Sequence, residues 1–137
     1  MLSQTLISTE ILQEKVSRNE LGYALADIIN GIRKEWDLSI REIAAILSLP
    51  QGTVKGWLKE NGHVGLDSVL DHNTQAIIDF IDIYNMIASF IVKTSDQILW
   101  FKTPSQNFQG LSPMMLICET PHNLTLVRSL IKNMLNP

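Results

Sequence analysis

The sequence has little that marks a secreted or membrane-bound protein. Its 137 residues include one cysteine, Cys118, so an internal disulfide is impossible and a reducing compartment is indicated. The most apolar stretch, residues 76–92, contains Asp79, Asp82 and Asn85, which argue against a membrane span. The first residues lack the basic and apolar regions of a secretory signal. We expect a cytoplasmic protein.

Motifs for catalysis and for metal or cofactor binding are also missing. Three histidines and the cysteine are scattered along the chain at His63, His72, Cys118 and His122, without the spacing of a zinc site. There is no Gly-rich phosphate loop, nucleophile elbow or HExxH motif. Asp79 and Asp82 share a helical face without a partner acid or base, which favours a solvated polar strip. We expect no enzyme, no metal and no cofactor.

An excess of basic residues, which is typical of nucleic-acid-binding domains, is lacking as well. Residues 1–66 contain 7 Lys+Arg against 8 Asp+Glu, and residues 67–137 contain 4 against 6, for a net charge of −3. Composition alone therefore gives no support to DNA binding. Such a function needs evidence from a local motif.

Helical periodicity runs through most of the chain. Helix-start signals are found, in chain order, at Ser17 with Glu20, Ser39 with Glu42, Thr94 or Ser95, Ser112 with Pro113, and Thr120 with Pro121. No segment alternates apolar and polar residues long enough to predict a strand. The sequence therefore predicts an all-α fold. Residues 62–73 have the weakest periodicity and divide the chain into two predicted domains, 1–66 and 67–137.

Residues 40–59, IREIAAILSLPQGTVKGWLK, have the pattern of two short helices joined by a tight turn. Ala44 stands where such helices approach most closely, and Ser48 occupies the turn position where Gly is usual. The positions expected between the two helices are apolar: Ile43, Leu47, Leu49, Val54 and Trp57. This spacing matches a DNA-binding helix-turn-helix and resembles the Xre/lambda-repressor type.

The resemblance implies that the helix starting near Gln51 enters the major groove of operator DNA. The expected DNA-binding residues are Arg41, Gln51, Thr53, Lys55 and Lys59. The alternative is a helical pair kept only for packing. Gly52 and Gly56 favour this alternative, because each Gly inside a helix costs about 0.5–1 kcal/mol relative to Ala.

Residues 100–117, WFKTPSQNFQGLSPMMLI, combine three large aromatics with turn residues. Pro104 and Gly110 favour a turn, and Phe108 between them is expected to anchor it in the core. With the following LVRSLIKNML, this run resembles the C-terminal domain of the Xre/MbcA/ParS antitoxin family. The matched residues are Trp100, Phe101, Thr103, Pro104, Phe108, Gly110, Pro113, Leu116, Val127, Leu130 and Ile131.

The family resemblance implies a type II antitoxin. Family members pair with RES-type toxins, which resemble ADP-ribosyltransferases and deplete NAD, and they cover the toxin's active site with their C-terminal residues. Carried onto this chain, the toxin-binding residues are Arg128, Lys132, Asn133, Asn136 and Pro137, and the helix-turn-helix represses the operon. A free-standing DNA-binding regulator without a toxin, and a pure interaction module that no longer reads DNA, remain open alternatives.

The apolar residues of the helix expected near 74–92 form two stripes. Because a helix in a small monomer normally buries one face, the second stripe predicts the interface of a two-fold homodimer at Ile83, Met86 and Phe90. A dimer would place two reading helices at half-sites about 34 Å apart. The alternative is a central helix surrounded by its own chain.

Overall fold

The computed structural model of the chain describes residues 18–65 and 72–136. Within these residues every regular element is a helix, as the sequence predicts. The elements are α2 (Arg18–Glu35), α3 (Ile40–Leu47), α4 (Gln51–Leu58), α5 (His72–Phe90), α6 (Thr94–Lys102), the short 3-10 helix η1 (Gln106–Phe108), α7 (Pro113–Glu119) and α8 (Asn123–Leu135). None of the described helices combines the length and the hydropathy that a membrane crossing requires.

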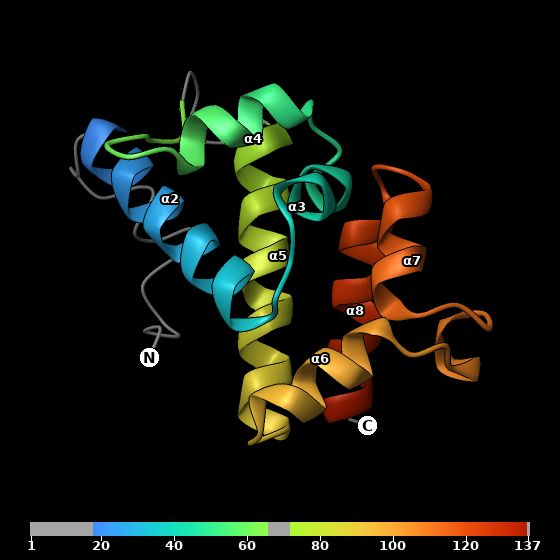
Figure 1. The fold of residues 1–137 in the computed structure, drawn as a ribbon. Coiled ribbons are helices and arrows are strands. Elements are labelled where there is room, and N and C mark those ends of the chain that lie inside the picture. The colour runs from blue at the N-terminus through green and yellow to red at the C-terminus, as the bar shows by residue number, and fades with distance from the viewer. Residues whose placement is uncertain (1–17, 66–71, 137) are drawn as a thin grey trace.

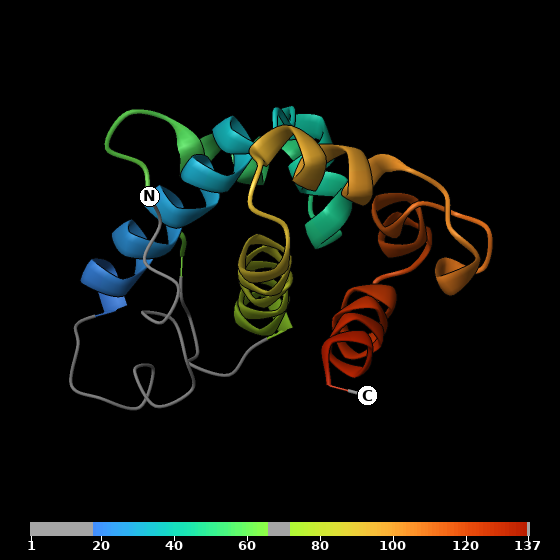
Figure 2. The ribbon, with the colours of Figure 1, turned by 90° about the horizontal axis from the view of Figure 1, so that it is seen from below.

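Helix α5 is the axis of the fold. It stands between α2 on one side and α8 on the other, and Figure 2 looks nearly along it. It also packs against α3 and against the start of α6, which crosses its lower end in Figure 1. From Thr74 to Tyr84 only Gln75 is exposed and Asp82 half-buried. Along this part of the helix both apolar stripes are therefore covered within the chain.

This burial corrects one residue of the predicted dimer interface. Ile83 has no exposed surface at all, because the second stripe of α5 lies in the core of its own chain. The stripe becomes accessible only toward the end of the helix, where Met86 is half-buried and Phe90 is exposed. The alternative of a central, surrounded helix therefore holds for most of α5.

Local capping chemistry fixes several helix ends where the sequence predicts them. The Ser39 hydroxyl accepts from the Glu42 amide at 3.0 Å, and the Glu42 carboxylate accepts from the Ser39 amide at 2.9 Å, which completes a capping box. Ser112 caps α7 by accepting from the Met115 amide at 3.0 Å, with Pro113 at the first helical position. Each cap satisfies amides that a helix end leaves unpaired.

The aromatic corner at residues 100–113 is a packed turn, as its residues predict. Thr103 is extended before Pro104, and Gly110 has a φ of 80°, in the region that favours glycine. Phe101 and Phe108 are buried, and the Phe108 ring meets the half-buried Trp100 edge-on with centroids 5.5 Å apart. These aromatics hold the corner in place.

A buried polar contact joins the turn directly after α2 to α6 inside the core. The Trp36 indole donates to the Gln97 side-chain oxygen at 2.9 Å, and the Gln97 amide donates to the Ile91 carbonyl at 2.8 Å. The Trp36 ring also lies 4.7 Å from Phe101 and 5.1 Å from Tyr84, centroid to centroid. One apolar core thus runs from α2 to α8. The predicted boundary between residues 66 and 67 lies outside the described residues and stays a prediction.

Three helix-start signals need comment. Ser17 lies outside the described residues. Neither Thr94 nor Ser95 caps α6, because the helix already begins at Thr94; Lys93 holds the cap position, and no side chain caps this helix. Thr120 and Pro121 do not start α8, which begins at Asn123. The Asn123 side-chain amide instead donates to the Leu116 carbonyl at 2.7 Å, so this turn is stabilised by a contact to α7 rather than by a proline at the first helical position.

Candidate nucleic-acid interface

Helices α3 and α4 are joined by the three residues Ser48, Leu49 and Pro50. Ser48 adopts the left-handed conformation, with a φ of 57°. The Leu49 amide donates to the Ala44 carbonyl at 2.9 Å and the Ser48 amide to the Ala45 carbonyl at 3.3 Å, which is the Schellman arrangement that ends many helices. In Figure 1 α4 runs across the view while α3 is seen nearly end-on. A left-handed residue at this point produces the sharp change of direction.

The apolar residues of this segment face inward. Ile43, Ala44, Leu47, Val54 and Trp57 are buried, and Leu49 is partly buried against them. The segment after α4 is held against α2, because the Val64 amide donates to the Gly22 carbonyl at 3.1 Å. A Cβ on Gly22 would lie 2.4 Å from the Val64 carbonyl oxygen, so this close approach requires glycine. α4 is thereby fixed on α2 and α3.

The polar residues of the segment face outward. All five predicted DNA-binding residues are exposed: Arg41, Gln51, Thr53, Lys55 and Lys59. Within the described part of the chain, none of their side chains is engaged in an ion pair or a side-chain hydrogen bond. Their charges and donors are therefore available to an external partner.

The local charge of α3 and α4 differs from that of the whole chain. Residues 39–59 contain three cations, Arg41, Lys55 and Lys59, and one carboxylate, Glu42. The Glu42 carboxylate is occupied in the capping box and lies 3.7 Å from the Lys102 ammonium. Glu42 is thereby offset by a neighbouring cation and by a helix N-terminus. With the exposed Glu60 that follows Lys59 included, the cations of this segment exceed the carboxylates by one.

The outer face of α4 also allows a close approach. No side chain caps its N-terminus, because Pro50 at the cap position contributes none, so no described side chain satisfies the first amides of the helix. A Cβ added at Gly52 or Gly56 would meet nothing within 4 Å. Packing inside the chain therefore does not explain these two glycines. They leave the surface beside Lys55 free of side chains.

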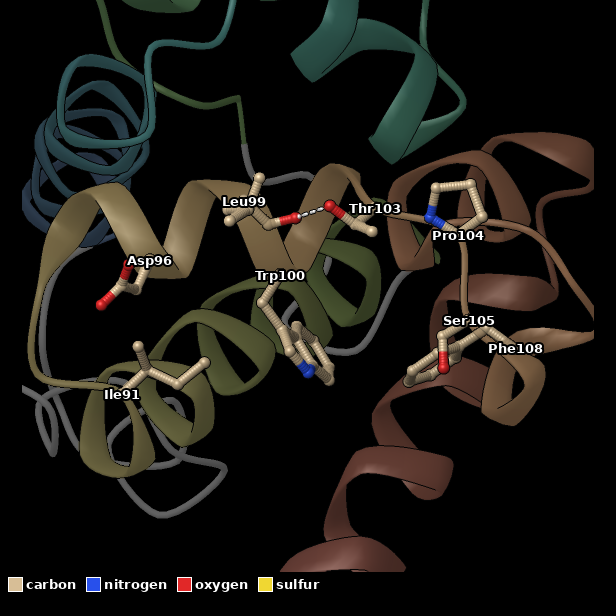
Figure 3. Close-up of a pocket in the computed structure, with 8 residues that line it drawn as sticks. All are labelled: Ile91, Asp96, Leu99, Trp100, Thr103, Pro104, Ser105 and Phe108. Carbon is tan, nitrogen blue, oxygen red and sulfur yellow. Dashed lines mark hydrogen bonds between the residues drawn. The ribbon is translucent and has the colours of Figure 1, made fainter.

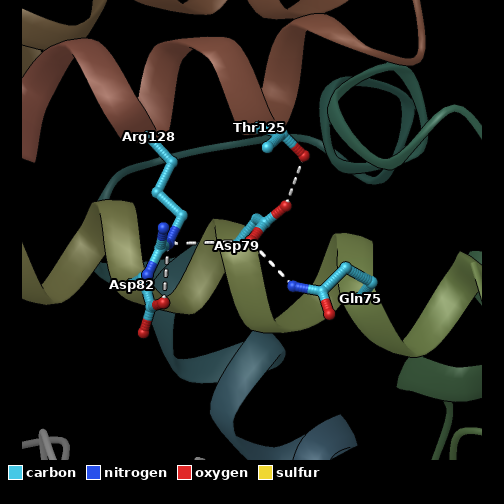
Figure 4. A network of polar contacts seen from close by, with 5 residues as sticks. All are labelled: Gln75, Asp79, Asp82, Thr125 and Arg128. Carbon is cyan, nitrogen blue, oxygen red and sulfur yellow. Dashed lines mark hydrogen bonds and ion pairs between the residues drawn. The ribbon is translucent and has the colours of Figure 1, made fainter. Parts of the chain in front are cut away.

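A second polar group of residues links α5 to α8 (Figure 4). The buried Asp79 carboxylate accepts from Thr125 Oγ1 at 2.7 Å and from Gln75 Nε2 at 3.0 Å. Arg128 Nε donates to Asp82 Oδ2 at 2.9 Å and lies 3.6 Å from Asp79 Oδ1. We call these five residues the α5–α8 clamp. It corrects the expectation of a solvated strip at Asp79 and Asp82, because both carboxylates face α8.

The predicted toxin-binding residues lie on or after α8, with different surroundings. The Arg128 guanidinium is shared by two carboxylates of the clamp, so its charge is already balanced within the chain. Lys132, Asn133 and Asn136 are exposed, and Pro137 lies outside the described residues. The face of α8 that packs on the core is apolar instead, with Leu124, Val127 and Ile131 buried.

Several important polar residues have no signal in the sequence that identifies their role. Asp79 and Gln97 are buried, and each is satisfied by a residue distant in the chain. The Tyr84 hydroxyl donates to the Glu35 carboxylate. The pKa of Tyr84 is raised, mainly because the phenol is buried and also because this carboxylate lies beside it. Partial burial of the Cys118 thiol, on a residue that is exposed as a whole, and the nearby Glu42 carboxylate also raise the pKa of this thiol. That last effect reflects the packing of α7 against α3.

Comparison with known proteins adds no relative. No family model matches the chain, and no match is found among curated proteins. Among the described residues, no group of three or more His, Cys, Asp or Glu side chains is arranged to hold a metal ion. The resemblances of residues 40–59 and 100–131 to known families therefore stay predictions from the sequence.

Proposed function

We propose that this protein is a DNA-binding antitoxin, which reads its own operator through α4 and covers a RES-type, NAD-depleting toxin with the exposed side of α8. The observation that carries the DNA-binding part is the outward face of α4. It combines unpaired cations with an uncapped helix N-terminus and two glycines that packing does not require. Each of these features suits contact with phosphates and base edges.

Helix α3, the turn at Ser48 and α4 support a role as a helix-turn-helix. Gln51 and Lys55 are four residues apart, so they share one face of α4. In the major groove, Gln51 can pair with an adenine through both ends of its amide, whereas Lys55 and Lys59 contact phosphates or guanine. A glycine at position 56 lets the backbone approach a phosphate closely. The local positive charge supports this role despite the acidic chain.

The antitoxin part of the proposal is supported by the resemblance of residues 100–131 and by the solvent face of α8. That face carries the exposed Lys132 and Asn133, followed by Asn136. Arg128 is the weakest member of the predicted toxin-binding set, because a toxin would have to displace two carboxylates from it. This observation favours the second candidate, a regulator that binds DNA without a toxin.

The experiment has two readouts on the full chain. In a gel shift on the DNA upstream of its own gene, we expect the double variant Lys55→Glu with Lys59→Glu to abolish binding at salt concentrations where the wild type binds. The matched control is Lys34→Glu with Lys132→Glu, which reverses two exposed charges away from α4. A wild-type protein that gives no shift at low salt contradicts the DNA-binding role.

The second readout is rescue of cells that express a toxin encoded beside this gene, followed by measurement of cellular NAD. We expect Lys132→Glu with Asn133→Arg to lose rescue while DNA binding is kept. These exposed positions are better tests than truncation after Leu130, because truncation also removes the buried Ile131. If no neighbouring gene encodes an NAD-consuming toxin, the antitoxin role fails and the free-standing regulator remains.

A further inference from the structure

Two hollows of the described structure differ in their chemistry. One, of about 510 Å³, lies between α6 and the η1 corner, and Figure 3 shows the Trp100 indole there between Ile91 and Phe108. Its lining is largely apolar, so nothing in it distinguishes one apolar occupant from another. The other, of about 250 Å³, lies between α2 and the end of α4 and is lined mainly by polar residues. We call it the α2–α4 hollow.

The fold fixes the walls of the α2–α4 hollow. In Figure 1 the end of α4 and the segment after it lie over the first half of α2. Asn61 has a left-handed φ of 61°, and the Gly62 amide donates to the Lys59 carbonyl at 2.8 Å. A Cβ on Gly62 would lie 2.4 Å from the Trp57 carbonyl oxygen, so this close turn requires glycine. The hollow is therefore bounded by backbone as well as by side chains.

Two opposite charges line the hollow without meeting. Asp27 reaches it from α2 and Lys59 from the end of α4, and both side chains are exposed. Neither forms an ion pair or a side-chain hydrogen bond within the described ranges 18–65 and 72–136, so the two charged groups lie more than 4.0 Å apart. A ligand that carries both charges can bridge this gap.

Two neutral donors also belong to the lining. Trp57 is only 8% exposed, yet its indole N–H donates to no acceptor in the described part of the chain and is not sealed from solvent. The side-chain oxygen of Asn30 accepts from Arg33 Nε at 3.0 Å, which leaves the amide hydrogens of Asn30 free to donate. Both donors favour a ligand with an acceptor group such as a carboxylate.

The end of α4 favours a positive group in the same hollow. Among the described residues, no backbone amide donates to the Gly56 or the Trp57 carbonyl, because α4 ends at Leu58. Unpaired carbonyls at a helix C-terminus carry the negative end of the helix dipole. Together with the Asp27 carboxylate, this partial charge favours an ammonium group.

We propose that the α2–α4 hollow binds a small zwitterion of the class of free α-amino acids, with its ammonium facing Asp27 and its carboxylate facing Lys59. Asp27 would repel a phosphate, Lys59 would repel a metal ion or a polyamine, and a neutral sugar would leave both charges unpaired. Sites for drug-sized ligands measure about 300–1,000 Å³, so the hollow suits a smaller molecule. A free amino acid carries both charges within such a molecule.

Binding in the hollow would compete with DNA, an effect that rests on the proposed function. Lys59 lines the hollow and is also one of the residues proposed to contact DNA. A carboxylate bound to Lys59 removes one cation from the DNA-binding face. The amino acid should therefore weaken operator binding about five-fold or more, and DNA should weaken amino-acid binding by the same factor.

Nuclear magnetic resonance on the ¹⁵N-labelled full chain tests the site without DNA. The twenty common amino acids are titrated one at a time. We expect at least one of them to bind saturably and to shift the indole N–H signal of Trp57. The Trp36 indole signal should stay in place, because that N–H already donates to Gln97. Analogues of the bound amino acid that lack its carboxylate or its ammonium should bind at least about ten-fold more weakly.

Single substitutions test the two charges separately. Asp27→Asn and Lys59→Met should each weaken amino-acid binding at least about ten-fold, and both positions are exposed, so the fold is kept. The matched controls are Asp37→Asn, at an exposed position just after α2, and Lys55→Met, at an exposed position of α4 outside the hollow. Both controls should bind the amino acid as the wild type does.

The site is overturned if no amino acid binds, if an analogue with one charge binds as well as the zwitterion, or if Asp27→Asn binds like the wild type. In a gel shift, the bound amino acid should weaken the operator complex of the wild type but not that of Asp27→Asn. An operator complex that is unchanged at saturating amino acid overturns the competition. If the wild type gives no gel shift at all, the DNA-binding role fails, whereas the titration without DNA still decides the site.

Discussion

Replacing Asp79 by Ala tests whether the α5–α8 clamp fixes α8 on the core. Asp79 is 2% exposed, and its carboxylate is the only member of the clamp that contacts three of the others: Thr125, Gln75 and Arg128. The substitution removes all three contacts at once. The partners left behind are not trapped, because Thr125 and Gln75 are exposed and Arg128 keeps its 2.9 Å contact to Asp82.

The size of the effect follows from these contacts. Hydrogen bonds to a charged group contribute about 1.5–3 kcal/mol each, but partners that regain water recover part of this. Two such bonds and one ion pair at 3.6 Å therefore predict a loss of about 3 kcal/mol in the free energy of unfolding. In a protein of this size the melting temperature falls by about 2–4 °C per kcal/mol. We expect Asp79→Ala to melt about 10 °C below the wild type.

Urea unfolding followed by far-UV circular dichroism measures the change, with Asp82→Ala as the matched control. The Asp82 side chain is 30% exposed and contacts only Arg128 in the clamp, so its removal should lower the free energy of unfolding by no more than about 1 kcal/mol. Asp79→Asn, which keeps the shape and one acceptor oxygen, should fall between the two. Equal losses in Asp79→Ala and Asp82→Ala would refute the reasoning.

Two further substitutions test single contacts. Ser48→Gly should raise the free energy of unfolding, measured in a urea titration, by about 0.5–1 kcal/mol. The reason is that Ser48 is held at a φ of 57°, which glycine adopts without strain. An unchanged or lower free energy of unfolding would contradict the turn geometry. Tyr84 has a raised pKa in the folded state, so its folded phenol keeps a proton that the unfolded chain loses above about pH 10, and the wild type becomes less stable as pH rises. Tyr84→Phe should remove this pH dependence, because the variant has no phenol to titrate. In urea unfolding above about pH 10, the free energy of unfolding should therefore fall less for the variant than for the wild type. If the two free energies fall in parallel with pH, the buried phenol is not the cause.

Local chemistry accounts for the features of the fold that the sequence predicts. The capping box at Ser39 and Glu42, the cap at Ser112 and the positive φ at Gly110 each depend on residues within three or four positions of one another. Ser48 at the turn belongs to the same class, since its conformation follows from helix termination. These predictions need no knowledge of the rest of the chain, and they are confirmed.

Contacts between distant residues explain what the sequence does not predict. Periodicity shows that Ile83 belongs to an apolar stripe, but it does not show whether the same chain or another one covers that stripe. Asp79 looks in the sequence like any other polar residue on a helix, yet it lies opposite Arg128 and Thr125, the latter 46 residues further along the chain. The five DNA-binding candidates are exposed and make no contact with a distant residue that would decide their position. Their exposure therefore agrees with the outward face predicted from the residue spacing in 40–59.

The acidic composition is a weak argument against DNA binding once the positions of the charges are known. At physiological ionic strength charges farther apart than about 8 Å are largely screened, so a phosphate responds to the face it touches and not to the net charge of −3. Asp79 and Asp82 share Arg128 between α5 and α8, and Glu35 accepts from Tyr84. These carboxylates belong to interior and inter-helix contacts. The face of α4 keeps its lysines unpaired, and that local excess is the charge a duplex would meet.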